Sequence, residues 1–385
     1  MILSARTGQG AASGCGAPLD PASCRRLLQG VSRSFALSIP LLRRDLAASL
    51  ALAYLHLRFI DTIEDELNLP PAARMDLLAE AAQLYTGGLQ DLQAAAALQA
   101  AVLRCLPEGG QAALRELAGS YLPLIAATRA RGEPLTAPLC RCASLMACGM
   151  AGMLAAGPVR DYPALERYCY CSAGVVGELL VRLFAPARAV PADADPLAVS
   201  FAQGLQMINM LRDAAHDRSQ GRTFLTPCQL RSAHFAGLCR AHLDHGLDFV
   251  RLCDARRQSD IRHFCLFNAA LAYAALRLSL GGCGTRHGRA RVRRLWLATA
   301  LAARSERLLS WLIPHLCRGL PGGRCDAAAL RARVSRWSDR ELPPRMRGQS
   351  MISYVPGAAA APVRDISAPA PVREQTANAI PDIHV

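Results

Sequence analysis

Carboxylates carried on an otherwise apolar helix constrain this chain more than any other feature of its sequence. Between Phe201 and Pro227, polar residues recur at steps of three and four, which puts them on one stripe of an α-helix. These residues are Gln206, Asn209, Asp213 and Asp217. The intervening residues are mostly apolar, so we expect this helix to be buried or to line a cavity. Buried carboxylates need a cation, and a divalent ion that prefers oxygen ligands suits them.

A second acidic pair with the same spacing lies far upstream. Asp61 and Asp65 end an apolar segment, Arg58 precedes them by about one turn, and Asn68–Pro71 is expected to close the helix because proline cannot continue it. One such pair alone is a common chance pattern on a helix. Two apolar helices that each end in a pair can face each other in a bundle and hold divalent ions between them. Such ions would bind a diphosphate.

Composition predicts an all-α protein with one large domain. Alanine and leucine dominate the 385 residues, aromatic residues make up only 5%, and β-branched runs are almost absent. No change in composition divides the chain, so we expect one helical domain over residues 19–350. The Gly/Ala/Ser-rich residues 1–18 and the Pro/Ala-rich residues 351–385 are expected to be disordered tails.

The basic charge of the chain comes entirely from arginine. The formal net charge is +14, and no lysine occurs anywhere in the sequence. Schiff-base chemistry, a pyridoxal anchor and the lysine of a phosphate-binding loop are therefore excluded. Arginine is the better bidentate partner for phosphate oxygens. The positive charge alone is compatible with nucleic acid, an anionic membrane surface or an anionic substrate.

Cysteine usage and hydropathy predict a cytoplasmic protein. The fifteen cysteines are scattered and lack the paired spacing of a zinc site, so we interpret them as mostly buried thiols in a reducing compartment. The first residues lack the apolar core of a signal peptide. Because no run of eighteen apolar residues occurs, we expect no membrane-spanning helix.

Three other segments carry candidate functional groups, each with a simpler alternative. Ser32, Arg33 and Ser34 could form an anion cradle, or they could begin a helix. The Tyr168 hydroxyl could act as an acid or base, or it could be a packed tyrosine with one hydrogen bond. The arginines between 286 and 294 could bind phosphate groups, although most such runs are solvated helix faces.

Five segments together, in this order, resemble the head-to-head prenyl synthases, which are the squalene and phytoene synthases. They are SRSF at 32–35, RFIDTIED at 58–65, MACGMAGML at 146–154, YCYCSAGVVG at 168–177 and LQMINMLRDAAHDRSQGRTF at 205–224. The resemblance covers roughly residues 28–300, and the DTIED and GMA segments are closer to squalene synthases than to the phytoene branch. It implies a single-domain isoprenoid synthase bundle with a central apolar cavity.

The resemblance also implies roles for individual residues. Four aspartates would hold Mg²⁺, for which Mn²⁺ could substitute, against two prenyl diphosphates: Asp61, Asp65, Asp213 and Asp217. The diphosphate-binding side chains would be Ser32, Arg33, Ser34, Arg58, Gln206, Asn209, Arg212 and Arg222. Tyr168 would handle the proton of the first condensation. The basic cluster at 291–294 resembles the segment thought to bind NADPH, with Arg291 and Arg293, together with Asn209, at that cofactor.

The implied activity is squalene formation from two farnesyl diphosphates through presqualene diphosphate. An enzyme with the same fold that releases presqualene diphosphate, dehydrosqualene or phytoene is the first alternative. Another class of protein, a non-catalytic arginine-rich one that binds nucleic acid or a membrane surface, is the second. Aromatic residues do not interleave with the arginines, which argues against nucleic acid. We expect a monomer with peripheral membrane contact for product release.

Overall fold

The computed structural model of the protein describes residues 17–341 except 66, 186–193, 220–224, 231 and 282–287. Within these ranges, the side chains of 215–219, 227 and 337–341 are outside the described set. By its internal contacts the chain divides into two units, Met1–Arg347 and Gly348–Val385, and the description below concerns the first. The expected tails fall almost entirely outside the described residues, so their disorder stays a prediction.

The described residues form helices and no strand, which confirms the all-α prediction. The first half contains α1 (Pro21–Val31), α2 (Phe35–Ser38), η1 (Ile39–Leu41), α3 (Arg44–Asp65), α4 (Pro71–Thr86), α5 (Leu92–Cys105), α6 (Ala112–Gly119), α7 (Tyr121–Arg129) and α8 (Glu133–Ala156). The second half contains α9 (Tyr162–Cys169), η2 (Tyr170–Gly174), α10 (Val175–Phe184), α11 (Ala194–Ser219), α12 (Pro227–Leu230), α13 (Ala233–Leu252), α14 (Ser259–Leu280), α15 (Arg289–Ala302), α16 (Glu306–Cys317) and α17 (Ala327–Glu341).

Local sequence signals explain where several helices begin. The Asp20 carboxylate accepts hydrogen bonds from the backbone N–H groups of Ala22 and Ser23 at the start of α1, at 2.8 and 3.0 Å. Ser232 caps α13 in the same way. Pro71 occupies the first position of α4, where its missing N–H costs nothing. The break between α3 and α4 therefore lies where the sequence predicted it.

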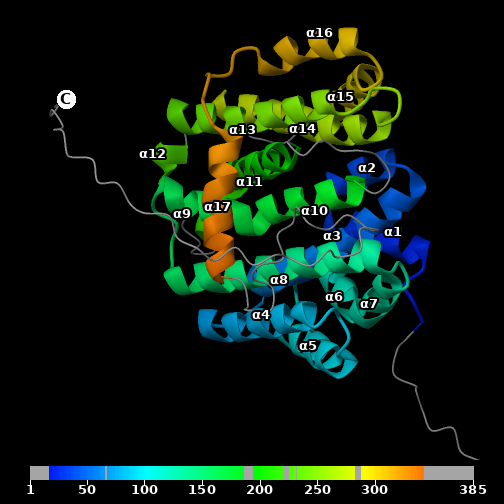
Figure 1. The fold of residues 1–385 in the computed structure, drawn as a ribbon. Helices are drawn as coiled ribbons and strands as arrows, with labels where there is room; N and C mark the ends of the chain where they lie inside the picture. The colour runs from blue at the N-terminus through cyan, green and yellow to red at the C-terminus, as the bar shows by residue number, and fades with distance from the viewer. Residues whose placement is uncertain are drawn as a thin grey trace, which may run out of the picture. The chain divides into compact units, whose positions relative to one another are not determined.

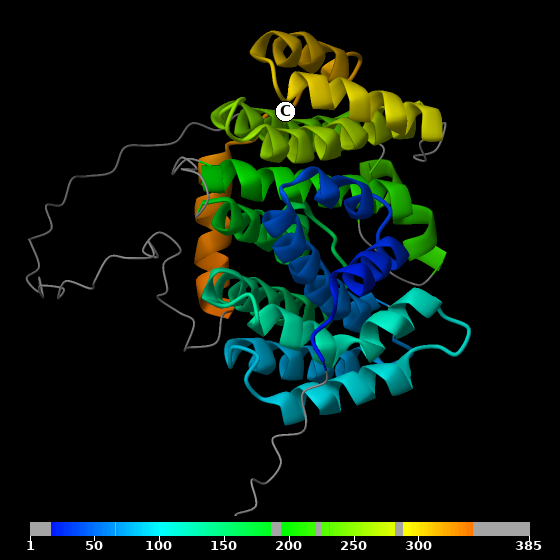
Figure 2. The ribbon, with the colours of Figure 1, turned by 90° about the vertical axis from the view of Figure 1, so that its right-hand side faces the viewer.

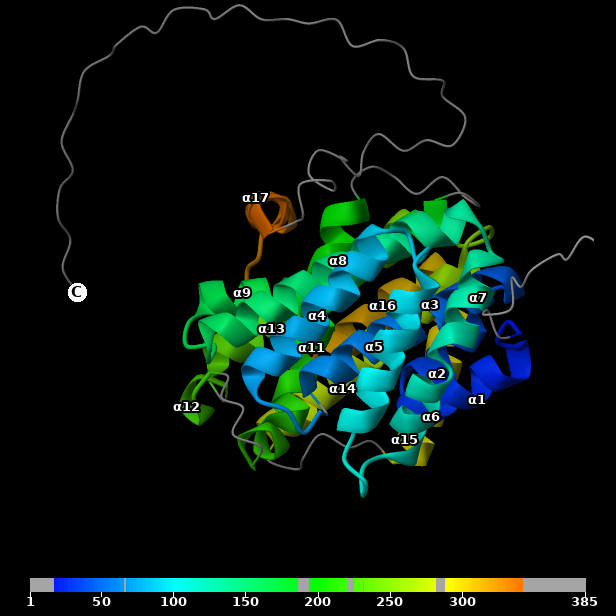
Figure 3. The same ribbon diagram turned by 90° about the horizontal axis from the view of Figure 1, so that it is seen from below.

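The helices are stacked in layers (Figure 1). From bottom to top of that view, α4 and α5 lie under α3 and α8, followed by α10 with α11, then α13 with α14, and finally α15 with α16. Packing contacts join α4 to α8, α10 to α11, α11 to α13 and α14 to α15. Figure 2 shows the same order of layers from the side, and Figure 3 views them from below, with α4 and α5 nearest the viewer. The helix α17 crosses the layers and contacts α8, α9 and α11.

Glycines let neighbouring layers approach closely. A Cβ atom on Gly177 of α10 would lie only 2.5 Å from the Ala198 carbonyl oxygen of α11. A Cβ atom on Gly246 of α13 would lie 2.4 Å from a ring carbon of Phe201 on α11. Both distances are shorter than van der Waals contact, so a larger residue would push α11 away from its neighbours. The position of α11 matters because it carries the second acidic pair.

Three helices are long and apolar enough to cross a membrane by length and composition alone, although no membrane-spanning helix was expected. They are α3, α8 and α14, and 61, 56 and 72% of their apolar windows are buried inside the protein. Most of this apolar surface packs against other helices.

All thirteen described cysteines are free thiols, and eight of them are buried. Burial raises the pKa of Cys24 to about 11 and that of Cys140 to about 12. Thiols with raised pKa values stay protonated and are poor nucleophiles and metal ligands. The interpretation of the cysteines as mostly buried thiols is confirmed for the described positions.

Candidate active site

The first acidic pair lies at the C-terminal end of α3. Asp61 and Asp65 are both partly buried, and Arg58, one turn earlier, forms an ion pair with the Asp61 carboxylate. Arg74 of α4 donates a hydrogen bond to the Glu64 carbonyl, which satisfies a backbone acceptor at the end of α3. The end of α3 therefore carries carboxylates at the boundary between the interior and solvent.

The second acidic pair lies towards the C-terminal end of α11. Gln206 and Asn209 are partly buried and share a hydrogen bond of 3.4 Å. The exposed Arg212 forms an ion pair with the partly buried Asp213, with 2.7 Å between Nη2 and Oδ2. Asp217 lies on α11, but its side chain is outside the described set, and Arg222 is outside the described residues.

Charged residues of both acidic motifs affect the pKa of Tyr54 on α3. Burial raises the pKa of Tyr54 above its usual value, and the Asp61 carboxylate raises it further. A hydrogen bond with Ser32 and the positive charges of Arg58 and Arg212 act in the opposite direction on this pKa. One phenol on α3 is therefore within electrostatic reach of Arg212 on α11, so the two motifs lie at the same region of the bundle.

Tyr168 lies beside the first acidic motif. Its pKa is well above its usual value, first because the side chain is buried and then because of the negative charges of Glu64, Asp65 and Asp61. The phenol therefore stays protonated at physiological pH. Tyr168 of α9 thus lies within electrostatic reach of the carboxylates at the end of α3.

The residue after Tyr168 connects it to α11. The Sγ atom of Cys169 is 3.9 Å from the Sδ atom of Met210, which follows Asn209. The Gln203 amide of α11 also donates to the Glu166 carbonyl of α9 at 2.9 Å. The site is therefore built from the end of α3, the end of α9 and the second half of α11.

A π-helical turn, η2, begins two residues after Tyr168. The Ser172 hydroxyl donates to the Tyr168 carbonyl at 2.8 Å, which fixes the backbone at the junction of α9 and η2. The Tyr170 hydroxyl donates to the buried Glu178 at 2.6 Å. Single π-helical turns inside α-helices are frequent at functional sites.

The SRSF segment is partly a helix start. The Ser32 hydroxyl accepts a hydrogen bond of 3.1 Å from the Phe35 N–H at the beginning of α2. Ser32 and Ser34 are partly buried, whereas Arg33 is exposed. The Phe35 ring packs against Tyr54, with 5.1 Å between ring centroids. Since Ser32 also reaches Tyr54, the segment lies beside the middle of α3, one turn before Arg58.

The two arginines predicted to bind the cofactor lie elsewhere. Arg291 and Arg293 are exposed on α15, which packs against α14 and α16. None of the hydrogen bonds or ion pairs of the described residues joins these two arginines to the acidic motifs. The structure therefore brings together the α3, α9 and α11 residues, whereas Arg291 and Arg293 are not part of that cluster.

The donor chemistry of the site suits a hard divalent ion. Among the described residues, no group of three or more potential ligands is close enough to hold a metal, but this set lacks the Asp217 side chain. Asp61, Asp65 and Asp213 supply carboxylate oxygens, which Mg²⁺ prefers, at partly buried positions that still reach solvent. Arg58 and Arg212 lie among them and can bind phosphate oxygens. The types of residue therefore suit a metal–diphosphate group, although the three described carboxylates do not by themselves form a metal-binding cluster.

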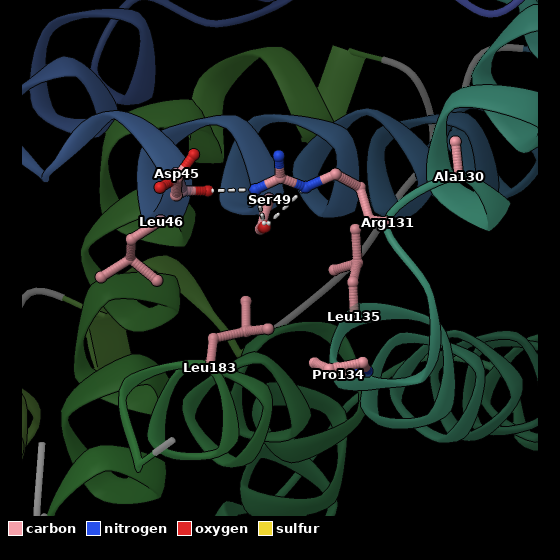
Figure 4. Close-up of a pocket in the computed structure, with 8 residues that line it drawn as sticks. All are labelled: Asp45, Leu46, Ser49, Ala130, Arg131, Pro134, Leu135 and Leu183. Atoms are coloured by element: carbon pink, nitrogen blue, oxygen red, sulfur yellow. Dashed lines mark hydrogen bonds between the residues drawn. The ribbon is translucent and has the colours of Figure 1, made fainter. Parts of the chain in front are cut away.

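A pocket of about 380 Å³ lies at the opposite end of α3 (Figure 4). Asp45 and Ser49, near the start of α3, are about 24 Å and about 18 Å of helix away from Asp61. Arg131 spans them with hydrogen bonds of 2.6 Å to the Asp45 carbonyl and 2.8 Å to the Ser49 hydroxyl. The pocket is also lined by Leu46, Ala130, Pro134, Leu135 and Leu183. The pocket contains none of the predicted site residues.

Tyr54 is the site residue that sequence reasoning missed. A signal was available, because Tyr54, Arg58 and Asp61 are spaced by four and three residues and therefore share one face of α3. Tyrosines at helical spacing are usually core residues, so the spacing alone would not have singled out this one.

The family model for squalene/phytoene synthase matches residues 28–296. A squalene synthase of Eremothecium gossypii is 26% identical over 292 residues, which are 67% of this chain and 62% of that protein. The squalene synthase of Rattus norvegicus is 28% identical over 205 residues, or 52% of this chain and 45% of that protein. Botryococcus squalene synthase, from Botryococcus braunii, is 29% identical over 214 residues, or 51% of this chain and 40% of that protein.

A structural comparison confirms the fold. The solved structure of TcSQS with a bound ligand has a TM-score of 0.63 at 19% identity, and the match covers 83% of this chain and 98% of that chain. This likeness agrees with the expected isoprenoid synthase bundle. The family match covers well over half of the chain and spans both acidic motifs. This chain therefore belongs to the squalene/phytoene synthase family.

Proposed function

We propose that this protein is a prenyltransferase that joins two farnesyl diphosphates head to head and forms squalene through presqualene diphosphate. The observation that carries the proposal is the position of Tyr168, a buried and protonated phenol beside Asp61 and Asp65. Met210, which contacts the neighbour of Tyr168, lies between Asn209 and Arg212 of the second motif. A proton-handling group thus lies next to two sets of groups suited to bind diphosphates.

Different residues would serve different steps of the first half-reaction, the condensation to presqualene diphosphate. Arg58 and Arg212 bind phosphate oxygens, and Asp61, Asp65 and Asp213, together with Asp217, would hold Mg²⁺. When bound there, Mg²⁺ supplies Lewis-acid stabilisation of the leaving diphosphate. The apolar helices exclude water, which would otherwise capture the allylic cation formed when the first diphosphate leaves. A central apolar cavity for the two prenyl chains is part of this proposal.

Tyr168 is proposed to hold or transfer the proton of the condensation. The new carbon–carbon bonds form a cyclopropane ring, one diphosphate leaves, and one proton is lost from the coupled product. Because the phenol is protonated at rest, it can orient the departing diphosphate oxygen by hydrogen bonding, and this oxygen can take up the proton. The second half-reaction releases the remaining diphosphate and consumes a hydride, for which NADPH is the proposed donor.

Arg291 and Arg293 take no part in the condensation step. They are exposed arginines on α15, and exposed guanidinium groups alone do not define a nicotinamide site. Their role at the phosphates of NADPH remains a proposal from the family resemblance. We also propose that the protein is a cytoplasmic monomer with peripheral membrane contact.

The decisive experiment is a product assay with the purified protein. Farnesyl diphosphate and Mg²⁺ are incubated with and without NADPH, diphosphate release is measured, and the hexane extract is analysed. Squalene formed only with NADPH supports the whole proposal. Presqualene diphosphate or dehydrosqualene, formed both with and without NADPH, supports head-to-head prenyl transfer and rejects squalene as the product. No diphosphate release from ten-, fifteen- or twenty-carbon donors rejects prenyl transfer.

A further inference from the structure

Large exposed apolar side chains are concentrated on one helical hairpin. Of the eight such side chains among the described residues, five belong to α15 and α16, and each is 40–61% exposed. These five are Trp296, Leu297, Leu301, Leu308 and Trp311, and we call them the outer face. Isolated exposed leucines need no explanation, but a cluster of this kind usually marks an interaction site.

Two more of the eight lie close to the same hairpin. Leu252 ends α13 next to a carbonyl that accepts from Arg262, and Arg262 also forms an ion pair of 2.5 Å with Glu306 at the start of α16. Leu280 ends α14 about one turn after Arg277, which donates to carbonyl groups at the end of α16. Both exposed leucines therefore flank α16.

The hairpin is firmly attached to the bundle by its inner side. Thr299, Ala300 and Ala302 of α15 are buried, as are Leu309 and Leu312 of α16. The helix α15 packs on α14 and on α16. The outer-face residues therefore belong to two helices that are well packed on the bundle, and Trp296 also packs edge-on against His263 of α14, with 5.4 Å between ring centroids.

Arginine accompanies the outer face along both helices. Arg294, Leu297 and Leu301 follow one another at steps of three and four, so they share one stripe of α15. Residues 288–318 contain seven arginines and one acidic residue, Glu306, which is already paired with the buried Arg262. The hairpin thus presents tryptophan and leucine surrounded by positive charge.

We propose that the outer face of α15 and α16 docks on the surface of an anionic lipid bilayer. Tryptophan and leucine can enter the boundary between headgroups and acyl chains, where an amphipathic helix lies in the plane of the membrane. The surrounding arginines are attracted to negatively charged headgroups. A second copy of this chain is a poorer partner, because it would bring two sets of arginines together.

This inference assigns a surface to the proposed membrane contact and does not depend on the proposed reaction. If the reaction holds, the outer face would bring a water-insoluble hydrocarbon product close to a membrane. Binding can be measured without turnover, so failure of the inference and failure of the proposed function are separate outcomes.

The test is sedimentation of the full-length protein with vesicles. We expect binding to vesicles made of equal parts phosphatidylcholine and phosphatidylglycerol, weaker binding at high salt, and little binding to phosphatidylcholine alone. The Leu301→Ser/Trp311→Ser variant should bind anionic vesicles at least about tenfold more weakly. The Arg294→Gln/Arg307→Gln variant should lose the preference for anionic vesicles while leaving the predicted cofactor residues Arg291 and Arg293 unchanged.

The matched control is Leu37→Ser, which replaces the eighth exposed residue, half exposed on α2. It should bind vesicles as the unaltered protein does. The proposal is overturned if the unaltered protein binds no vesicles, or if the Leu301→Ser/Trp311→Ser variant binds as well as the control. It is also overturned if light scattering finds a dimer that this double substitution dissociates, because the outer face would then join two copies of the chain.

Discussion

Arg212 donates two hydrogen bonds to the carboxylate of Asp213, its neighbour along α11, at 3.0 Å to Oδ1 and 2.7 Å to Oδ2. Arg58 pairs with Asp61 on α3 in a similar way. Each acidic motif therefore contains a carboxylate held by a guanidinium that could equally bind phosphate. An incoming diphosphate would compete for the arginine and leave the carboxylate for a cation.

The first prediction concerns these carboxylates. Asp61→Asn and Asp213→Asn keep the side-chain size but remove the negative charge that would hold Mg²⁺. We expect each variant to lower the rate of diphosphate release from farnesyl diphosphate by at least about a hundredfold, because several kcal/mol of charge stabilisation are lost. The rate is measured at saturating Mg²⁺, and circular dichroism checks that the fold is retained.

Two aspartates provide controls for this prediction. Asp45 lies on α3 at the opposite end from Asp61, and Asp248 forms an exposed ion pair of 2.8 Å with Arg251 on α13. Asp45→Asn and Asp248→Asn should retain nearly full activity. Full activity in Asp61→Asn or Asp213→Asn would rule out the proposed metal site.

The second prediction concerns Tyr168. Tyr168→Phe removes only the hydroxyl, so the packing at the end of α9 is kept. If the phenol handles the proton, the rate of condensation should fall by about 10²–10⁴-fold, the usual contribution of a positioned acid or base. Tyr162→Phe, six residues earlier on α9, is the control, because Tyr162 packs edge-on against His234 with 5.0 Å between ring centroids. Equal rates in the two variants would leave Tyr168 with a packing role only.

The sequence predicted the helices that carry the two acidic motifs, because helix formation there depends on local residues. The spacing of Asp61 and Asp65 on α3, and of Asn209 and Asp213 on α11, requires only a regular helix, and both helices form. The proximity of the two motifs came from a chemical argument about buried charge. It stays a prediction, and the structure adds that Asp61 and Arg212 both affect the pKa of one phenol, Tyr54.

Features that depend on distant contacts could not be predicted in this way. No proline or glycine pattern in the sequence predicts the π-helical turn η2 that begins two residues after Tyr168. Arg331, on α17, lies 153 positions after Glu178 in the sequence, yet the two form a nearly buried ion pair. His56 on α3 forms hydrogen bonds with Tyr85 of α4 and with Thr128 of α7. No periodicity along one helix specifies which distant polar groups will meet.

The third prediction concerns the attachment of α17. Arg331 is 3.1 Å from the Glu178 carboxylate, whose side chain is only 3% exposed, and 2.6 Å from Asp195. The Tyr170 hydroxyl donates a hydrogen bond of 2.6 Å to the same Glu178 carboxylate. Arg331→Met would leave a buried carboxylate without its cation, which typically costs about 3–5 kcal/mol in the free energy of unfolding. Urea unfolding measures this cost.

A double substitution and a surface pair test the explanation. Arg331→Met combined with Glu178→Gln should recover part of the lost free energy of unfolding, because the uncompensated charge is also removed. Arg333→Gln removes an ion pair with Glu166 in which the arginine is half exposed, and it should cost less than about 1 kcal/mol. Equal losses for Arg331→Met and Arg333→Gln would argue against a special role of the buried pair.

The last prediction concerns stability at acidic pH. His56 is completely buried, and its ring nitrogens are 2.9 Å from the Tyr85 and Thr128 hydroxyls. Burial lowers the pKa of His56 from 6.5 to about 3. Between these values the unfolded chain binds a proton that the folded protein does not, so the free energy of unfolding is unaffected above pH 6.5 and falls as the pH decreases towards 3.

From pH 7 to pH 4.5, His56 should account for a loss of roughly 2–3 kcal/mol in the free energy of unfolding. Urea unfolding at both pH values should therefore show that His56→Gln loses less free energy of unfolding between pH 7 and pH 4.5 than the unaltered protein does. This holds even if the substitution changes the stability at pH 7. Some pH dependence will remain, because burial also lowers the pKa of His242 to about 4. His315→Gln, on an exposed part of α16, should keep the full loss. If His56→Gln and His315→Gln lose the same amount between the two pH values, His56 is not the group whose protonation destabilises the fold.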